Sequence, residues 1–233
     1  MLTTPASPTP QCVYCGRTEP RLTKDHVPPK CLFLRPRPQL ITVPACHTCN
    51  DLYKKDDEYF RLAVTSEAAY RDTGATKLWK GRIAPRMGPG LRSTLLTTMR
   101  PAEVRTPGGL VIDQGIAMRF DKHRVDRGVE RIVRGLLWNH YQSRPTAARF
   151  EIYYNPDLQP FRDILAATPL HSIGESAFRY RHGITTDDAN TSVWGLQFYE
   201  HTHFLVLVFS EHYLAQEAIE AARGQAGSEG ASN

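Results

Sequence analysis

The sequence predicts an α+β protein, in which a small zinc-stabilised module at the N-terminus is followed by a larger α+β domain. Three observations lead to this fold class. Two Cys-x-x-Cys pairs lie within the first fifty residues, periodic apolar residues mark two long helices, and apolar runs of strand length fill much of the second half of the 233-residue chain. The expected organisation is a flexible lead over 1–9, the zinc module over 10–72, the α+β domain over 73–222 and a disordered tail over 223–233.

Four cysteines, Cys12 with Cys15 and Cys46 with Cys49, are the expected zinc ligands. Two cysteines three positions apart can turn both sulfurs onto one ion, so each pair supplies half of a tetrahedral site. The 30 residues between the pairs exceed the spacing of a zinc ribbon, so we expect a further element between them. Chance pairs or a redox motif are the alternatives, and the doubling of the motif disfavours both. Cys31 is expected to be a buried or idle thiol.

Periodicity predicts the remaining elements. Residues 50–71 are expected to form one helix, and 122–143 another, with an apolar face of Val125, Val129, Ile132, Val133, Leu136 and Leu137. The stretch 81–109 is rich in Gly, Pro and Arg, which predicts loops and short strands. Strands are expected at 110–120, 149–154, 177–181, 193–200 and 203–209, with a short helix near 159–166.

The dipeptide Asp25-His26 lies between the cysteine pairs, and Asn50 follows the second pair directly. Phosphodiester hydrolysis needs an activated water and positive charge near phosphorus. A histidine with an ordinary pKa of about 6.5 accepts a proton near neutral pH. A carboxylate and an amide oxygen suit Mg²⁺ or Mn²⁺. An exposed turn is the alternative for a lone Asp-His pair, but the flanking cysteines favour a functional site.

The runs CVYCG, LTKDHVPPKCLF and LITVPACHTCNDLYKKDDEYFR resemble the zinc-stabilised branch of the HNH nucleases, over residues 10–61. The resemblance implies a ββα-metal (treble-clef) fold, with a hairpin that carries the Asp-His pair and a helix that begins at the second cysteine pair. It also implies that His26 is the general base, that Asp25 binds the catalytic divalent metal, and that Asn50 takes the place of the last residue of the HNH motif. Members often carry a middle Asn before the second pair, whereas the stretch 39–43 has none.

Charge is distributed unevenly along the chain. Residues 1–60 carry 8 Lys/Arg against 6 Asp/Glu, residues 61–149 carry 17 against 7, and residues 150–233 carry 4 against 11. A basic centre of this kind predicts a polyanion-binding protein. The expected nucleic-acid contacts are Lys30, Lys54 and one helix face formed by Arg124, Arg127, Arg131 and Arg134.

Each of these contacts has an alternative. Lys54 is also spaced for a solvated pair with Glu58, and the arginines for an ordinary helix face with Asp126 and Glu130 as partners. Loop arginines such as Arg82, Arg86 and Arg92 are further candidates for the contact region.

These features predict a metal-dependent HNH-type DNA endonuclease with structural Zn²⁺ and catalytic Mg²⁺ or Mn²⁺. RNA is an alternative substrate, and an effector of a bacterial defence or mobile-element system fits the hypothesis. The competing hypothesis is a non-catalytic zinc module that binds nucleic acid or a partner protein, favoured by the missing middle Asn. The C-terminal domain is expected to bind a regulatory partner. The sequence contains no stretch of 18 or more apolar residues, so we expect no membrane span. Cysteines without a secretory signal predict a cytoplasmic protein.

Overall fold

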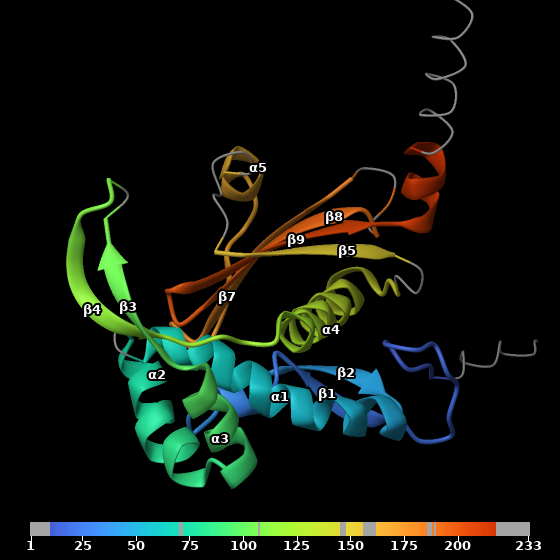
Figure 1. The fold of residues 1–233 in the computed structure, drawn as a ribbon. Helices are drawn as coiled ribbons and strands as arrows, with labels where there is room; N and C mark the ends of the chain where they lie inside the picture. The colour runs from blue at the N-terminus through green and yellow to red at the C-terminus, as the bar shows by residue number, and fades with distance from the viewer. Residues whose placement is uncertain are drawn as a thin grey trace, which may run out of the picture.

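The computed structural model describes residues 10–69, 72–106, 108–144, 148–155, 162–185, 188 and 190–217 (Figure 1). It contains both helices and strands, as the predicted α+β class requires. The expected lead over 1–9 and tail over 223–233 lie outside the described residues. None of the helices in the described ranges is both long enough and apolar enough to cross a membrane.

An antiparallel hairpin and a long helix form the N-terminal part. Strand β1 (Thr23–Val27) pairs with β2 (Ile41–Ala45), and the 3-10 turn η1 (Lys30–Leu32) lies between them. Helix α1 (His47–Ala68) begins three residues earlier than the expected position 50. Cys46 is its N-cap, and the Cys46 sulfur accepts a hydrogen bond from the Cys49 N–H at 3.4 Å. The second cysteine pair is therefore built into the start of the helix.

The next segment is more helical than its composition predicts. Helix α2 (Thr73–Leu78), the π-helical turn η2 (Trp79–Ile83), the 3-10 turn η3 (Ala84–Arg86) and helix α3 (Pro89–Thr98) precede the hairpin of β3 (Arg100–Arg105) and β4 (Val111–Ala117). The prediction of loops over 81–109 is wrong for much of this stretch. Pro89 starts α3, where the fixed φ of proline suits a first helical turn.

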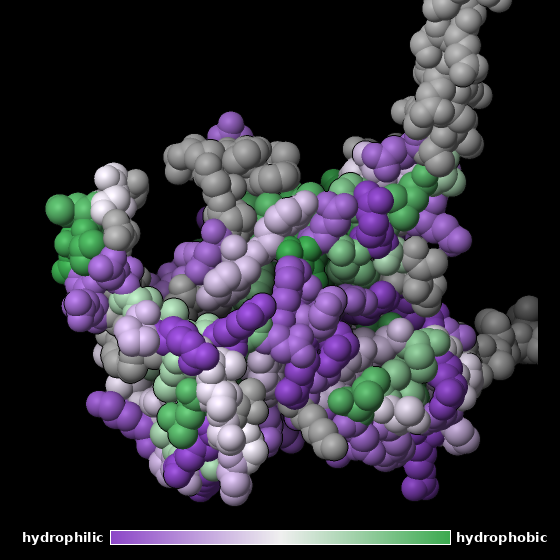
Figure 2. Space-filling view, in the orientation of Figure 1, coloured by the Kyte–Doolittle hydropathy of each residue, from purple (hydrophilic) through white to green (hydrophobic). Residues whose placement is uncertain are grey.

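The β3–β4 hairpin projects away from the rest of the chain (Figure 1). Its exposed apolar side chains, Leu110, Val111 and Ile112, lie at and next to its tip, and apolar residues gather there in the space-filling view (Figure 2).

Helix α4 (Lys122–Tyr141) lies between the N-terminal hairpin and a five-stranded antiparallel sheet (Figure 1). Every residue of its predicted apolar face is buried. The sheet has the order β5-β9-β8-β7-β6, formed by β5 (Arg149–Tyr154), β6 (His171–Ile173), β7 (Phe178–Ile184), β8 (Ser192–Phe198) and β9 (Thr202–Phe209), and the short helix α5 (Arg162–Ala166) follows β5 in sequence.

Two glycines allow α4 to approach the N-terminal part closely. A Cβ atom at Gly135 would lie 2.4 Å from Cγ2 of Val27 in β1, and one at Gly128 would lie 2.8 Å from Cδ2 of Phe60 in α1. Buried apolar residues of the hairpin, both long helices and the sheet consequently form one continuous core. The hairpin that carries Asp25 and His26 is thus held against α4 by direct packing.

Candidate functional site

The four predicted cysteines meet at one place. Their sulfur atoms all lie within 4.8 Å of one another, and those of Cys15 and Cys46 are 3.7 Å apart. Sulfurs placed tetrahedrally at about 2.3 Å from zinc are separated by about 3.8 Å, so this donor set fits a zinc ion. The Val13 N–H donates to the Pro44 carbonyl at 2.9 Å, which brings the first pair beside the end of β2. The cluster therefore joins the N-terminal turn, the hairpin and the start of α1.

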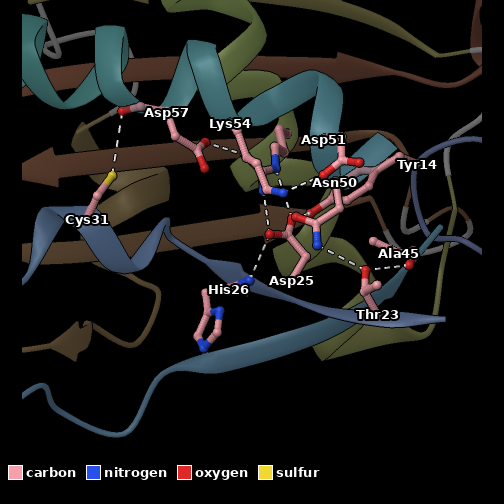
Figure 3. A network of polar contacts seen from close by, with 11 residues as sticks. Tyr14, Thr23, Asp25, His26, Cys31, Ala45, Asn50, Asp51, Lys54 and Asp57 are labelled. Carbon is pink, nitrogen blue, oxygen red and sulfur yellow. Dashed lines mark hydrogen bonds and ion pairs between the residues drawn. The ribbon is translucent and has the colours of Figure 1, made fainter. Parts of the chain in front are cut away.

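Asp25 is buried beneath α1, and its carboxylate is fully engaged (Figure 3). Oδ1 accepts from the His26 N–H at 2.9 Å and from Nη2 of Arg131, while Oδ2 accepts from the Tyr14 hydroxyl at 2.5 Å and from Nε of Arg131 at 2.9 Å. A carboxylate offers about four lone-pair positions, and these four donors use them all. In this arrangement the residues do not fit a divalent cation at Asp25, because Arg131 already provides the positive charge there.

Arg131 is only 3% exposed. Its Nη1 also pairs with Asp57 of α1, and its guanidinium lies 4.6 Å from the centre of the Tyr53 ring. Burial raises the pKa of Asp57 to about 7, with the negative charge of Asp25 adding to the effect and Arg131 opposing it. The expectation that Arg131 belongs to an exposed nucleic-acid face is therefore wrong, because two acidic residues draw this side chain into the interior.

The other arginines of α4 are also paired. Arg124 and Arg127 both bind the carboxylate of Asp56, at 3.0 and 2.9 Å, and Arg134 binds Glu130 at 2.8 Å. The Asp56 carboxylate stays ionised, since the hydrogen bonds from Arg127 and Arg124 outweigh its burial and lower its pKa. The arginine face of α4 is thus in large part a contact with α1, formed because two consecutive acids on α1 face it.

His26 points to the opposite side of β1 from Asp25, away from α1 (Figure 3). The side chain is half-buried. Burial, followed by the positive charge of Lys30, lowers the pKa of His26 below its ordinary value. The imidazole is consequently neutral at neutral pH and able to accept a proton, but it does not share a face of the strand with the Asp25 carboxylate.

Asn50 lies in the first turn of α1 and faces the start of β1 (Figure 3). Its amide nitrogen donates to the Thr23 hydroxyl at 3.0 Å, and that hydroxyl donates to the Ala45 carbonyl at 2.8 Å. Of the two predicted lysines, Lys30 is exposed on η1, and Lys54 pairs with Asp51 at 2.5 Å and not with Glu58. Asn50 and Asp25 are therefore both placed between the hairpin and α1, whereas the two lysines are on the surface.

A second group of basic residues lies outside α4, and the sequence predicts only some of its members. Arg61, Arg82 and Arg86 line a hollow of about 330 Å³ formed by α1, η2 and η3, together with Glu58. Nε of Arg61 is buried there without a hydrogen-bond partner. Among the described carboxylates, none forms an ion pair with these three arginines.

This hollow belongs to a larger group of five arginines. Burial and the repulsion of Arg35, Arg37, Arg86 and Arg61 lower the pKa of Arg82. We call these five residues the basic cluster. Arg37 of this cluster also contributes to the lowered pKa of His26. Arg82 and Arg86 were visible in the sequence as loop arginines, but Arg61 lies within a helical pattern and gave no such signal.

No family model matches the chain, and no curated protein or solved structure matches it. The chemistry available to the site therefore follows from its own residues.

Proposed function

We propose that the chain is an HNH-type phosphodiesterase that acts on DNA, built on a zinc-stabilised module of ββα-metal (treble-clef) type. The order of parts supports this proposal: a hairpin with Asp25 and His26, a four-cysteine cluster, and a helix with Asn50 in its first turn. The observation that carries it is the position of His26, a neutral, half-buried imidazole on the hairpin, whose pKa is lowered by burial and by the positive charges of Lys30 and Arg37.

Each of these groups has a distinct task in the proposed reaction. The basic cluster binds backbone phosphates, because among the described carboxylates none forms an ion pair with Arg61, Arg82 or Arg86. Arg37 would place one of these phosphates near His26. His26 then takes a proton from the attacking water. A divalent cation would supply further positive charge at phosphorus and the leaving oxygen.

Asp25 in the described state is bonded to Arg131 and not available to such a cation. A cation could use this carboxylate only after Arg131 releases it. Control by a partner protein in a bacterial defence or mobile-element system extends the same proposal.

One observation favours a second candidate function, a non-catalytic zinc module that binds nucleic acid or a partner protein. The Arg131–Asp25 pair is buried and reinforced by Tyr14, whose hydroxyl keeps its proton because burial raises its pKa well above the ordinary value. In that case Asp25 is a structural residue, and the basic cluster binds nucleic acid without cutting it.

Supercoiled plasmid distinguishes the two functions. Zinc-loaded protein is incubated with plasmid in Mg²⁺ or Mn²⁺, and nicking is measured beside gel retardation of the same DNA. The proposed enzyme nicks the plasmid. If the protein retards DNA and never nicks it in either metal, the binding function replaces the enzymatic one.

A further inference from the structure

Three histidines that are far apart in the sequence meet at the C-terminal end of α4. His140, His171 and His182 each offer a ring nitrogen, and these nitrogens all lie within 4.8 Å of one another. The ring centres are 4.5 to 5.5 Å apart. This histidine cluster is separate from the four cysteines and from the Asp25–His26 hairpin.

The fold explains why these side chains converge. His171 on β6 lies opposite Tyr180 on β7, and His182 follows Tyr180 by two positions. The side chains of His171, Tyr180 and His182 are therefore on one face of the sheet. The last turn of α4 covers this face, since Nε2 of His140 is 2.9 Å from the Tyr180 hydroxyl. Two neighbouring strands and one helix end thus deliver one imidazole each.

The chemistry of the cluster suits a cation. Each neutral imidazole can ligate a metal ion through one ring nitrogen, and the three ring nitrogens converge here. The Tyr141 hydroxyl lies 2.9 Å from Nδ1 of His182, which leaves Nε2 as the ligand and fixes the ring, as partners of metal-bound histidines do. The end of a helix also carries partial negative charge.

We propose that His140, His171 and His182 form a second metal site, which binds a divalent transition ion of the zinc class. Imidazole suits such ions, and three protein ligands leave a fourth position for water or a small anion. Nitrogens at about 2.1 Å from zinc in a tetrahedral site are about 3.4 Å apart, and the three ring nitrogens already lie within 4.8 Å of one another. All three side chains are half-buried, so an ion can reach them from solvent.

Aromatic packing is the competing explanation. The rings of His171 and Tyr180 are stacked at 15°, and those of His182 and Trp194 at 23°. Phenylalanine at positions 171 and 182 preserves this stacking but removes the nitrogens. Substitution by Phe therefore separates ligation from packing.

The test is a titration of protein whose cysteine cluster already holds one equivalent of zinc. Binding of Zn²⁺ is measured by calorimetry. Binding of Co²⁺ is measured by its absorption spectrum, because sulfur and nitrogen ligands give different absorption bands. We expect wild type to bind a second equivalent without sulfur ligation. We expect His171→Phe and His182→Phe to lose this second equivalent, and Tyr141→Phe to bind it about 10- to 100-fold more weakly. The control is His123→Phe, on the exposed first turn of α4, which is expected to behave as wild type.

Two results overturn the proposal. One is a wild-type protein that binds no second equivalent of either ion. The other is a folded His171→Phe variant that binds the second equivalent as tightly as wild type. If a Phe variant does not fold, as seen by circular dichroism, Tyr141→Phe decides, because unchanged affinity in that variant places the ion elsewhere.

Discussion

The guanidinium of Arg131 on α4 and the carboxylate of Asp25 on β1 form a buried two-pronged ion pair between residues 106 positions apart in the sequence. Nε of Arg131 lies 2.9 Å from Oδ2 of Asp25, and Nη2 binds Oδ1. The pair joins α4 to the hairpin of the candidate site. It also occupies the Asp25 carboxylate, which accepts further hydrogen bonds from the Tyr14 hydroxyl and the His26 N–H.

Removing Arg131 is expected to destabilise the fold strongly. Arg131→Met leaves Asp25 buried with an uncompensated charge and takes from Asp57 its cationic partner, which predicts a loss of about 3–5 kcal/mol in the free energy of unfolding. Urea denaturation measures it. Arg127→Met is the matched control, because that side chain is 48% exposed and its partner Asp56 retains Arg124; its expected cost is below about 1 kcal/mol. Equal, small losses in both variants would show that the buried pair is not a structural clamp.

The close packing of α4 against β1 leads to a second prediction. Gly135→Ala places a methyl group against Val27 and is expected to cost about 1–3 kcal/mol, because the packed helix and hairpin must separate. Gly81→Ala, where no heavy atom lies within 4 Å of the added group, is expected to be close to neutral. Val27→Ala in the Gly135→Ala background should recover part of the loss. Simple additivity of the two changes in a double-mutant cycle would refute the proposed contact.

The cysteines are expected to react in two groups. Burial, with a further contribution from the charge of Asp57, raises the pKa of Cys31 from 9.0 to about 12, so its thiolate is about a thousandfold rarer than in an ordinary cysteine. Zinc bound by the other four would protect them. Iodoacetamide followed by mass spectrometry should therefore find little labelling of zinc-loaded native protein and five labelled sites in denaturant. Fast labelling of Cys31 in the native protein would contradict this assignment.

The basic cluster is expected to dominate DNA binding. Changing Arg61, Arg82 or Arg86 to Gln should weaken binding similarly for all sequences and reduce the slope of log K against log salt by about one per lost phosphate contact. Arg92→Gln is the control, since this exposed arginine lies outside the hollow. Arg124→Gln and Arg127→Gln should change the slope less, because Asp56 already neutralises part of their charge. If the α4 variants instead reduced the slope more than the basic-cluster variants, the DNA-contact surface would be on α4.

The sequence predicts the parts of this structure that depend on local pattern. The periodic apolar residues of α4, the strand-length runs rich in apolar residues at β5, β7, β8 and β9 and the paired cysteines each carry their own signal. Strand β6 has only three residues, too few for a period to show. Helix α3 is missed because its Pro89 and Gly90 are read as loop residues, although proline is favourable in a first turn.

Residues that depend on distant partners could not be placed in this way. Arg131 has the same spacing from its neighbours as the other arginines of α4, and only the tertiary position of Asp25 and Asp57 explains its burial. The basic cluster likewise combines arginines from several segments, and the histidine cluster joins residues from three elements. Spacing along the chain does not predict contacts between residues that are far apart in the sequence.

The rate of plasmid nicking by His26→Ala tests the central claim most directly. Zinc-loaded wild type, His26→Ala and His123→Ala are compared in Mg²⁺ or Mn²⁺ at equal DNA occupancy, with retention of zinc checked in each. If His26 is the general base, His26→Ala should nick about 10²–10⁴-fold more slowly than wild type while DNA affinity and the rate of His123→Ala stay unchanged. Equal nicking by wild type and His26→Ala, or none by wild type at full DNA occupancy, would contradict the assignment of this hairpin as a hydrolytic site.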